Sequence, residues 1–140
     1  MKIAIPVDGS ENANRAVDHV IGLARSRGDI EIHLLNVQIP VLSGHAKMFI
    51  SDQQLNDYYR EEGFAALKPA QEKLKNANLT HKHHISVGHI AETIAQYARE
   101  NNIDQIIMGT RGMGAIAEFV LGSVASKVIH LSHVPVTLIK

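Results

Sequence analysis

The chain has no cysteine and no tryptophan, and only 4% of its residues are aromatic. The lack of cysteine excludes a disulfide scaffold, a thiolate zinc site and a catalytic thiol. An excess of charge of one sign is also lacking, because 14 Lys and Arg residues balance 14 Asp and Glu residues. A basic surface that neutralises nucleic-acid phosphates is therefore not expected. Apolar runs of about 18 residues, which membrane-spanning helices need, do not occur.

The remaining composition is that of an ordinary globular domain, with 45% hydrophobic and 20% charged residues. A chain of 140 residues is expected to form one domain, 1–140, that buries roughly two thirds of its unfolded surface. The first apolar run, Ile3–Val7, is too short for the apolar region of a signal peptide. A cytoplasmic location is the resulting expectation.

Short apolar runs alternate with segments of helical periodicity from end to end. The predicted strands are Lys2–Val7, Glu31–Val37, Thr80–Val87, Ile106–Met108 and Val134–Ile139. The predicted helices lie between them, at Ala13–Ala24, Asp52–Ala77, Ile90–Ala98 and Val124–Leu131. Pro69 is expected to kink the second helix or divide it in two, and Gln38–Ser51 is an unassigned long loop. This alternation predicts an α/β fold, a doubly wound five-stranded parallel sheet with helices on both faces.

A glycine-bearing segment follows the fourth predicted strand and precedes the last helix. It runs from Gly109 to Ser123 and reads GTRGMGAIAEFVLGS. Gly109, Gly112 and Gly122 allow backbone N–H groups to approach an anion, and the helix N-terminus adds partial positive charge. In a doubly wound sheet, ligands bind at the carboxyl ends of the strands, where the strand order reverses. The segment therefore predicts a nucleotide phosphate site at that edge.

The first strand ends in Pro6-Val7-Asp8-Gly9-Ser10, at the same predicted edge. A carboxylate at Asp8 could accept hydrogen bonds from a ribose or adenine, or help to hold a phosphate-bound Mg²⁺ through water. Alternatively, Asp8 or Ser10 caps the first helix. The residues alone leave both interpretations open.

Other chemistries have weaker support. Gly112–Ala117 fits G-x-G-x-x-A, but it follows the fourth strand and no acidic residue lies in the remaining chain where a dinucleotide fold places one. A Walker A sequence is absent, which disfavours a P-loop enzyme. His81 and His83 share a face if both lie in a strand, yet no third metal ligand is evident beside them. Ser123 and His130 lie on one helix with no geometry for a hydrolase dyad.

The spacing G-x₂-G-x₉-G-[ST] is filled by Gly109, Gly112, Gly122 and Ser123. Together with the PVDGS segment at 6–10 and the run Val134–Val136, this pattern resembles the universal stress protein family over the whole chain. The resemblance implies a Rossmann-like sheet of the adenine nucleotide alpha hydrolase type, with strand order 3-2-1-4-5. It places the first and fourth strands side by side.

The resemblance also implies binding of ATP, or of ADP or AMP, with Mg²⁺ held mainly by the phosphates near Asp8. Carried over by position, the adenosine side is Pro6, Val7 and Asp8, with Val37 against adenine. The near wall is Met108, Gly109, Arg111 and Gly112, and the phosphate contacts are Gly122, Ser123 and Val124. Asn36 departs from the family, which often has histidine there.

We therefore expect an ATP-binding universal stress protein in which the nucleotide is a regulatory ligand of the stress response. No catalytic residue is assigned, and any hydrolysis or autophosphorylation is expected to be slow. One alternative is an enzyme of the same fold group that hydrolyses the nucleotide or transfers its α-phosphate, although Asp8–Glu11 lacks the S-G-G-x-D-S pattern of such enzymes. The other is an interaction module that binds no nucleotide.

The last predicted strand is apolar and β-branched at Val136–Ile139, with Lys140 as its only nearby charge. In the implied strand order it lies at an edge of the sheet, where unpaired N–H and C=O groups invite pairing. A homodimer through this strand is therefore expected, as the family resemblance also implies. Neither nucleic acid nor a membrane is expected as a partner.

Overall fold

A computed structural model describes residues 1–41, 44, 48–111 and 121–140. Its elements are β1 (Lys2–Pro6), α1 (Glu11–Ser26), β2 (Glu31–Gln38), α3 (Asp52–Asn76), β3 (Lys82–Val87), α4 (Ile90–Glu100), β4 (Gln105–Gly109), α5 (Ser123–Leu131) and β5 (Val136–Ile139). Within those residues, no helix is both long and apolar enough to cross a membrane.

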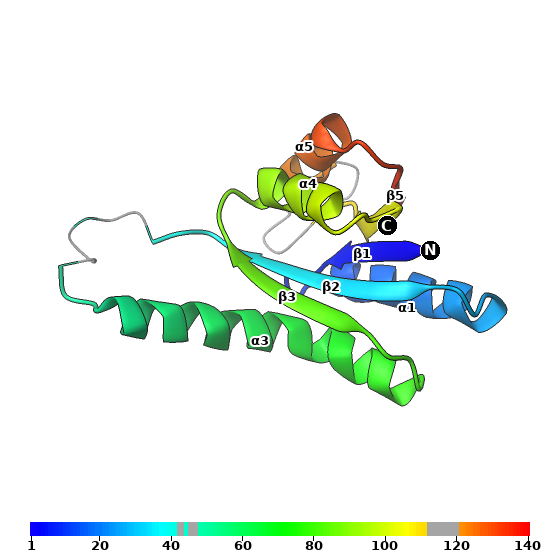
Figure 1. Cartoon of the computed structure of the whole chain (residues 1–140), viewed down its shortest axis with the longest axis horizontal. Helices are drawn as coiled ribbons and strands as arrows, with labels where there is room; N and C mark the ends of the chain where they lie inside the picture. The colour runs from blue at the N-terminus through cyan, green and yellow to red at the C-terminus, as the bar shows by residue number, and fades with distance from the viewer. Residues whose placement is uncertain (42–43, 45–47, 112–120) are drawn as a thin grey trace.

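The strands form one sheet in the order β3-β2-β1-β4-β5, and every neighbouring pair is parallel. This confirms the expected fold class and strand order. Figure 1 shows α4 and α5 on one face of the sheet and α1 and α3 on the other. Because β1 lies between β2 and β4, the loops that follow these three strands leave from the same edge.

Two apolar clusters, one on each face, hold these layers together. Successive side chains of a strand point to opposite faces, and β1 contributes to both clusters accordingly. Ile3, Ile5 and Val7 pack with α1 and α3, whereas Ala4 packs with α4 and α5. With its three central residues buried, β1 is the middle of the core as well as of the sheet.

Pro69 lies inside α3, and the helix continues through it as one element from Asp52 to Asn76. Of the two outcomes expected at Pro69, a kink or a division of the helix, the division is wrong. Proline removes one backbone donor, but the buried residues Leu67, Ala70 and Leu74 keep both flanks of the helix on the sheet. Most element boundaries differ from the predicted ones by one or two residues. His81, for example, precedes β3.

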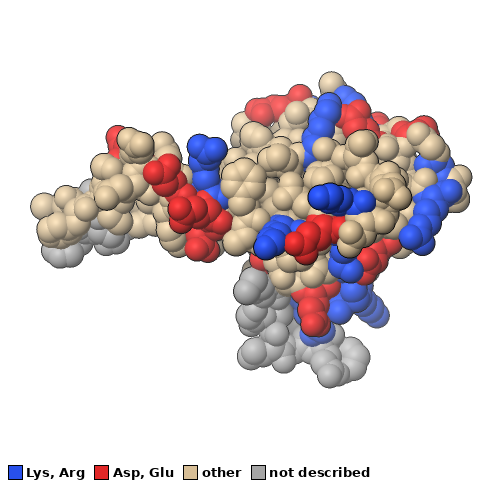
Figure 2. Space-filling model, turned by 90° about the horizontal axis from the view of Figure 1, so that it is seen from below, with Lys and Arg blue, Asp and Glu red and all other residues tan. Residues whose placement is uncertain are grey.

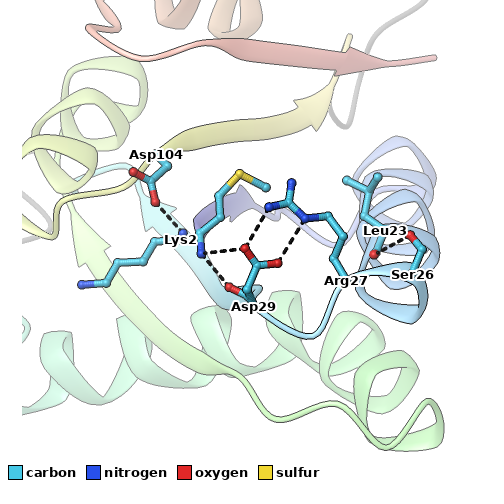
Figure 3. Close-up of polar contacts among 7 residues, drawn as sticks. Lys2, Leu23, Ser26, Arg27, Asp29 and Asp104 are labelled. Atoms are coloured by element: carbon cyan, nitrogen blue, oxygen red, sulfur yellow. Dashed lines mark hydrogen bonds and ion pairs between the residues drawn. The ribbon is translucent and has the colours of Figure 1, made fainter.

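The amino ends of the strands are fastened by polar contacts, as Figure 3 shows. The α-amino group of Met1 lies 3.8 Å from a carboxylate oxygen of Asp29, and Arg27 pairs with the same oxygen at 2.8 Å. The hydrogen bond from Arg27 lowers the pKa of Asp29. On the neighbouring strand pair, the Asp104 carboxylate accepts from the backbone N–H of Lys2 at 2.7 Å. These contacts set the start of β1, away from its carboxyl end.

Glu31 joins β2 to β3 at this same end of the sheet. Its Oε1 accepts from Lys82 Nζ at 2.9 Å and lies 2.9 Å from Nε2 of the buried His33. The hydrogen bond from Lys82 and then that from His33 lower the pKa of Glu31 to about 2. On its other side, His33 Nδ1 lies 2.8 Å from the hydroxyl of Tyr97 on α4. Glu31 therefore anchors a polar network that crosses from the sheet to α4.

Glu31→Gln should destabilise the protein in a pH-dependent way. Because the folded-state pKa is depressed, the carboxylate contributes stability fully above its ordinary pKa of 4.5 and loses it as pH falls towards about 2. The difference in unfolding free energy between wild type and variant should shrink from pH 7 to pH 3 in urea titrations. Glu62→Gln, at an exposed position, is the control for removal of a surface carboxylate. A pH-independent difference at Glu31 would contradict the assignment.

Candidate functional site

The turn after β1 is built by Gly9 and Ser10. Gly9 has φ +86°, a conformation that side chains with a Cβ rarely adopt. The Ser10 hydroxyl caps α1 by accepting from the backbone N–H of Ala13 at 3.2 Å. Asp8 Oδ1 accepts from the backbone N–H of Ser10 at 2.9 Å. Ser10 is therefore the helix cap, and Asp8 is an exposed carboxylate at the sheet edge that supports the turn.

Two buried or half-buried amides hold the end of β1 in place. The backbone N–H of Val7 donates to Leu35 O at 2.8 Å, and Val7 O accepts from Asn36 Nδ2 at 2.8 Å. Gln38 Nε2 then donates to Asn36 Oδ1 at 2.6 Å. Asn36 stands where the universal stress protein family often has histidine. Its side chain thus holds Val7, the residue that follows β1. Sequence reasoning did not find this role, because a polar residue in a predicted strand carries no signal of its partner.

The two ends of the glycine segment meet in space. The backbone N–H of Gly122 donates to Thr110 O at 2.7 Å, while Gly122 O accepts from the Ser126 N–H at 3.0 Å and so begins α5. A Cβ at Gly122 would lie 3.0 Å from Arg111 Cα and 3.1 Å from Thr110 O. Glycine is therefore needed where the chain returns from the loop. The geometry puts Gly122 and Ser123 beside the end of β4, as the motif spacing predicts.

Asn12 ties α1 to the same loop. It is 5% exposed, and its Nδ2 donates to Arg111 O at 3.1 Å. A Cβ at Gly109 would lie 2.8 Å from Asn12 Cβ and 3.0 Å from its backbone C, so glycine allows α1 to approach β4 closely. Asn12 Oδ1 is buried and has no hydrogen-bond partner in the described part of the chain. A buried acceptor without a hydrogen-bond partner lowers the stability of the fold.

A hollow of about 220 Å³ lies between the N-termini of α4 and α5. Ser123 and Val124, which are expected as phosphate contacts, line it together with residues that were not predicted, namely Ile39, Gly88, His89, Ile90, Ala91, Glu92 and Lys127. The Gly88 N–H donates to Gln38 O at 2.9 Å and so holds the residue after β3 to the end of β2. Both helix N-termini bring partial positive charge to this hollow. The signal that sequence reasoning overlooked is that Gly88–Ala91 follows a parallel strand at the same edge.

The remaining predicted residues fall into three groups. Val37 and Met108 pack in one apolar cluster with Val124 and Ile90, which gives the hollow an apolar wall behind it. Pro6, Val7, Asp8, Gly109 and Arg111 lie at the ends of β1 and β4, outside the lining of that hollow. Gly112 lies outside the described residues. The roles of all these residues towards a ligand remain predictions.

The histidines of the β3 segment do not assemble a metal centre. His81 Nε2 lies 3.4 Å from Gln71 Nε2, and burial, followed by the nearby His83, lowers the pKa of His81. His83 instead packs edge-on against Phe64, with ring centroids 5.6 Å apart. Within the described residues, no group of three His, Asp or Glu side chains could hold a metal ion.

These features define a doubly wound α/β domain with a glycine loop at the switch point of its sheet. A sequence model described as the universal stress protein family matches residues 1–140. The universal stress protein MJ0531 of Methanocaldococcus jannaschii is 31% identical over 141 residues, which cover 99% of this chain and 81% of that protein. The chain belongs to the universal stress protein family.

Solved structures agree with this assignment. The structure of MJ0577, also from Methanocaldococcus jannaschii, has a TM-score of 0.82 at 31% identity and covers 99% of this chain and 94% of its own. A universal stress protein from Archaeoglobus fulgidus in complex with dAMP has a TM-score of 0.71 at 24% identity, with 100% and 98% covered. Two further structures of this fold, at 23% and 21% identity, are complexes with cAMP and AMP.

Replacing Gly109 by alanine should destabilise the fold, because the added Cβ meets Asn12 at 2.8 Å and the buried helix must shift. Overpacking of this kind typically costs about 1–3 kcal/mol. Gly22→Ala is the matched control, since nothing lies within 4 Å of a Cβ there and Gly22 is inside α1. That change should stabilise by roughly 0.5–1 kcal/mol. Chemical denaturation measures both, and equal effects at the two positions would contradict the close approach of α1 to β4.

Proposed function

We propose that this protein binds an adenine nucleotide, with ATP and its Mg²⁺ as the expected form, and that the nucleotide acts as a regulatory ligand. The observation that carries the proposal is the closure of the glycine segment by the Gly122–Thr110 hydrogen bond of 2.7 Å. This contact places the N-terminus of α5 at the carboxyl edge of the sheet, beside the end of β4. Backbone donors and a helix N-terminus at a switch point are suited to phosphate.

The proposed roles follow from position. Ser123 and Val124 offer backbone N–H groups at the start of α5, which is capped by no side chain. Gly122, whose N–H donates to Thr110 O, would face the phosphates without a side chain in the way. The base would lie towards Val37, where the hollow adjoins the apolar cluster of β2, β4 and α4. Asp8, at the end of β1, would face the ribose or an Mg²⁺ held by the phosphates. Related structures of this fold with dAMP, cAMP and AMP support an adenine nucleotide as the class of ligand.

Ser123→Asp tests the phosphate position directly. A carboxylate in the first turn suits the helix itself, so the variant should fold, but it should repel a phosphate at the same place. Gly122→Lys is the second variant, and Gly28→Lys, where a Cβ meets nothing within 4 Å, is its control. Isothermal titration with Mg–ATP should show binding for wild type and Gly28→Lys and at least about tenfold weaker binding for the other two.

The proposal fails if folded Ser123→Asp and Gly122→Lys bind Mg–ATP as wild type does, or if wild type binds no adenine nucleotide. The same samples distinguish a regulatory ligand from a substrate. Steady-state hydrolysis near the median enzyme rate of about 10 s⁻¹, in protein free of contaminating ATPase, would favour the enzyme alternative instead.

We also propose that the protein forms a homodimer through β5. The strand lies at an edge of the sheet and pairs only with β4 among the described strands. Pro135 O and Ile139 O accept from the N–H groups of Ile106 and Thr110. In a parallel strand the backbone groups of alternate residues point to the same side, so those of Thr137 also face β4. The outward N–H groups belong to Val136 and Leu138.

Leu138→Pro should therefore shift a β5 dimer towards monomer in sedimentation equilibrium, because it removes an outward donor while leaving the β4–β5 ladder in place. Thr137→Pro is the contrasting variant, since it removes an inward donor and should lower the melting temperature instead. A wild-type chain that is monomeric at micromolar concentration excludes this interface.

A further inference from the structure

The N-terminal turns of α3 project beyond the carboxyl ends of the strands, as Figure 1 shows. The segment that leads into them is apolar and exposed, with Met48 77%, Phe49 75% and Ile50 40% accessible. From Ser51 to Tyr58, only Leu55 is partly buried. A capping box of Ser51 and Gln54 begins the helix, but a helix without packing is marginal in water. This projecting arm, residues 48–58, is suited to contact with another surface.

One face of α3 also has a strong charge polarity. Asp57, Glu61, Phe64, Lys68 and Lys75 are exposed and recur at helical spacing on the side away from the buried stripe. Acidic side chains precede Phe64 and basic ones follow it. Figure 2 views the molecule from the α3 side and shows Asp and Glu gathered towards the projecting end, with Lys and Arg more frequent beyond it.

The charges of this outer face have no internal use. Within the described residues, neither the acidic pair nor the two lysines of the face take part in an ion pair. Lys73 provides the contrast, because it lies on the other side of α3 and pairs with Asp18 of α1 at 3.0 Å. The charges that help to fix α3 on the domain are thus separate from those of the outer face.

A groove of about 470 Å³ follows the basic half of this face. It lies between the C-terminal half of α3 and the segment that leads into β3, and its lining is Lys68, Gln71, Glu72, Lys75, Leu79, Thr80 and His81. Phe64 stands near its other end, against His83. The groove thus presents two lysines, one glutamate (Glu72) and an apolar residue, Leu79, and its excess of positive charge suits an elongated partner that is mainly acidic and apolar.

We propose that the occupant is the acidic half of α3 from a second copy of this chain, with the two helices antiparallel about a twofold axis. In the register that the charges favour, Asp57 faces Lys75, Glu61 faces Gln71, and Phe64 faces Lys68 of the other copy. The arm of each copy then extends along the partner's groove towards Leu79. Because the contact is isologous, every favourable pair occurs twice.

The energy of such a contact comes mainly from apolar burial. Exposed ion pairs contribute only about 0–1 kcal/mol each, so the charges act chiefly to select the antiparallel orientation. The apolar contribution comes from Phe64, which is 42% exposed, from the lysine stems and from the arm. A helix of 25 residues is only about 37 Å long, so the buried area is small. A dimer with a dissociation constant in the micromolar range is therefore expected.

Charge reversal on each half tests the inference. Asp57→Lys/Glu61→Lys makes both halves of the face basic, and Lys68→Glu/Lys75→Glu makes both acidic. Neither variant should self-associate through α3, so in sedimentation equilibrium at about 200 µM, well above a micromolar dissociation constant, its average mass should be about half that of wild type. An equal mixture of the two should regain the wild-type mass, because each copy now complements the other. About 0.5 M NaCl should weaken the recovered complex.

Glu100→Lys on α4 is the control, since it reverses the charge of one acidic side chain on the opposite face of the sheet. It should leave the mass unchanged. Circular dichroism establishes that each variant is folded. The β5 contact is removed from the comparison by placing Leu138→Pro in every sample, so that only association through α3 is measured. Variants that each keep the wild-type mass overturn the inference, as does a mixture that fails to recover it or a wild-type chain that is monomeric at about 200 µM.

Discussion

Parallel pairing of β1 with both β2 and β4 is the constraint on which the rest of this structure depends. A strand bordered on both sides and covered on both faces can expose its polar backbone only at its ends. The chain that leaves β1 must therefore turn at once, and Gly9, with φ +86°, makes that turn. The same rule applies to β4, where Gly109 lets α1 approach and Gly122 brings the chain back to Thr110. The candidate site is the place where these two turns meet.

Two buried amides contribute to the rigidity of this edge. Asn36 and Asn12, each under 6% exposed, are held against Val7 O and Arg111 O. Charged side chains form networks at the opposite, amino edge, where Glu31 joins Lys82 to His33 and Asp29 joins Arg27 to the N-terminus. At the carboxyl edge, fixed neutral dipoles hold the strand ends beside the exposed Asp8, and such dipoles suit the anion site proposed above.

Hydrophobic patterning predicted the elements in which burial follows a regular pattern along the sequence. Ile3, Ile5, Ile106 and Ile107 lie in strands buried on both faces, and such strands read as continuous apolar runs. The strand order needed the family resemblance, since periodicity does not say which strands are neighbours. The structural roles of Asn12 and Asn36 were not predicted, because their hydrogen-bond partners lie 99 and 29 residues away in the sequence. A local rule predicted that Pro69 kinks or divides its helix, but buried residues on both sides of Pro69 keep the helix undivided.

The strand order also places the candidate ligand site and the two candidate contact surfaces on different edges of the sheet. With β1 in the centre, the carboxyl edge carries the candidate ligand site, β5 forms one lateral edge, and β3 with the flanking α3 forms the other. Contacts at the two lateral edges therefore do not compete for the same atoms. However, α3 begins at the same carboxyl edge, after the segment that leaves β2 beside Ile39, which also lines the hollow between α4 and α5. A second copy that holds the projecting arm would therefore also restrain the segment that leads from Ile39, at the hollow, into α3. Ligand binding in the hollow and association through α3 would thus be linked by the segment of chain between Ile39 and α3.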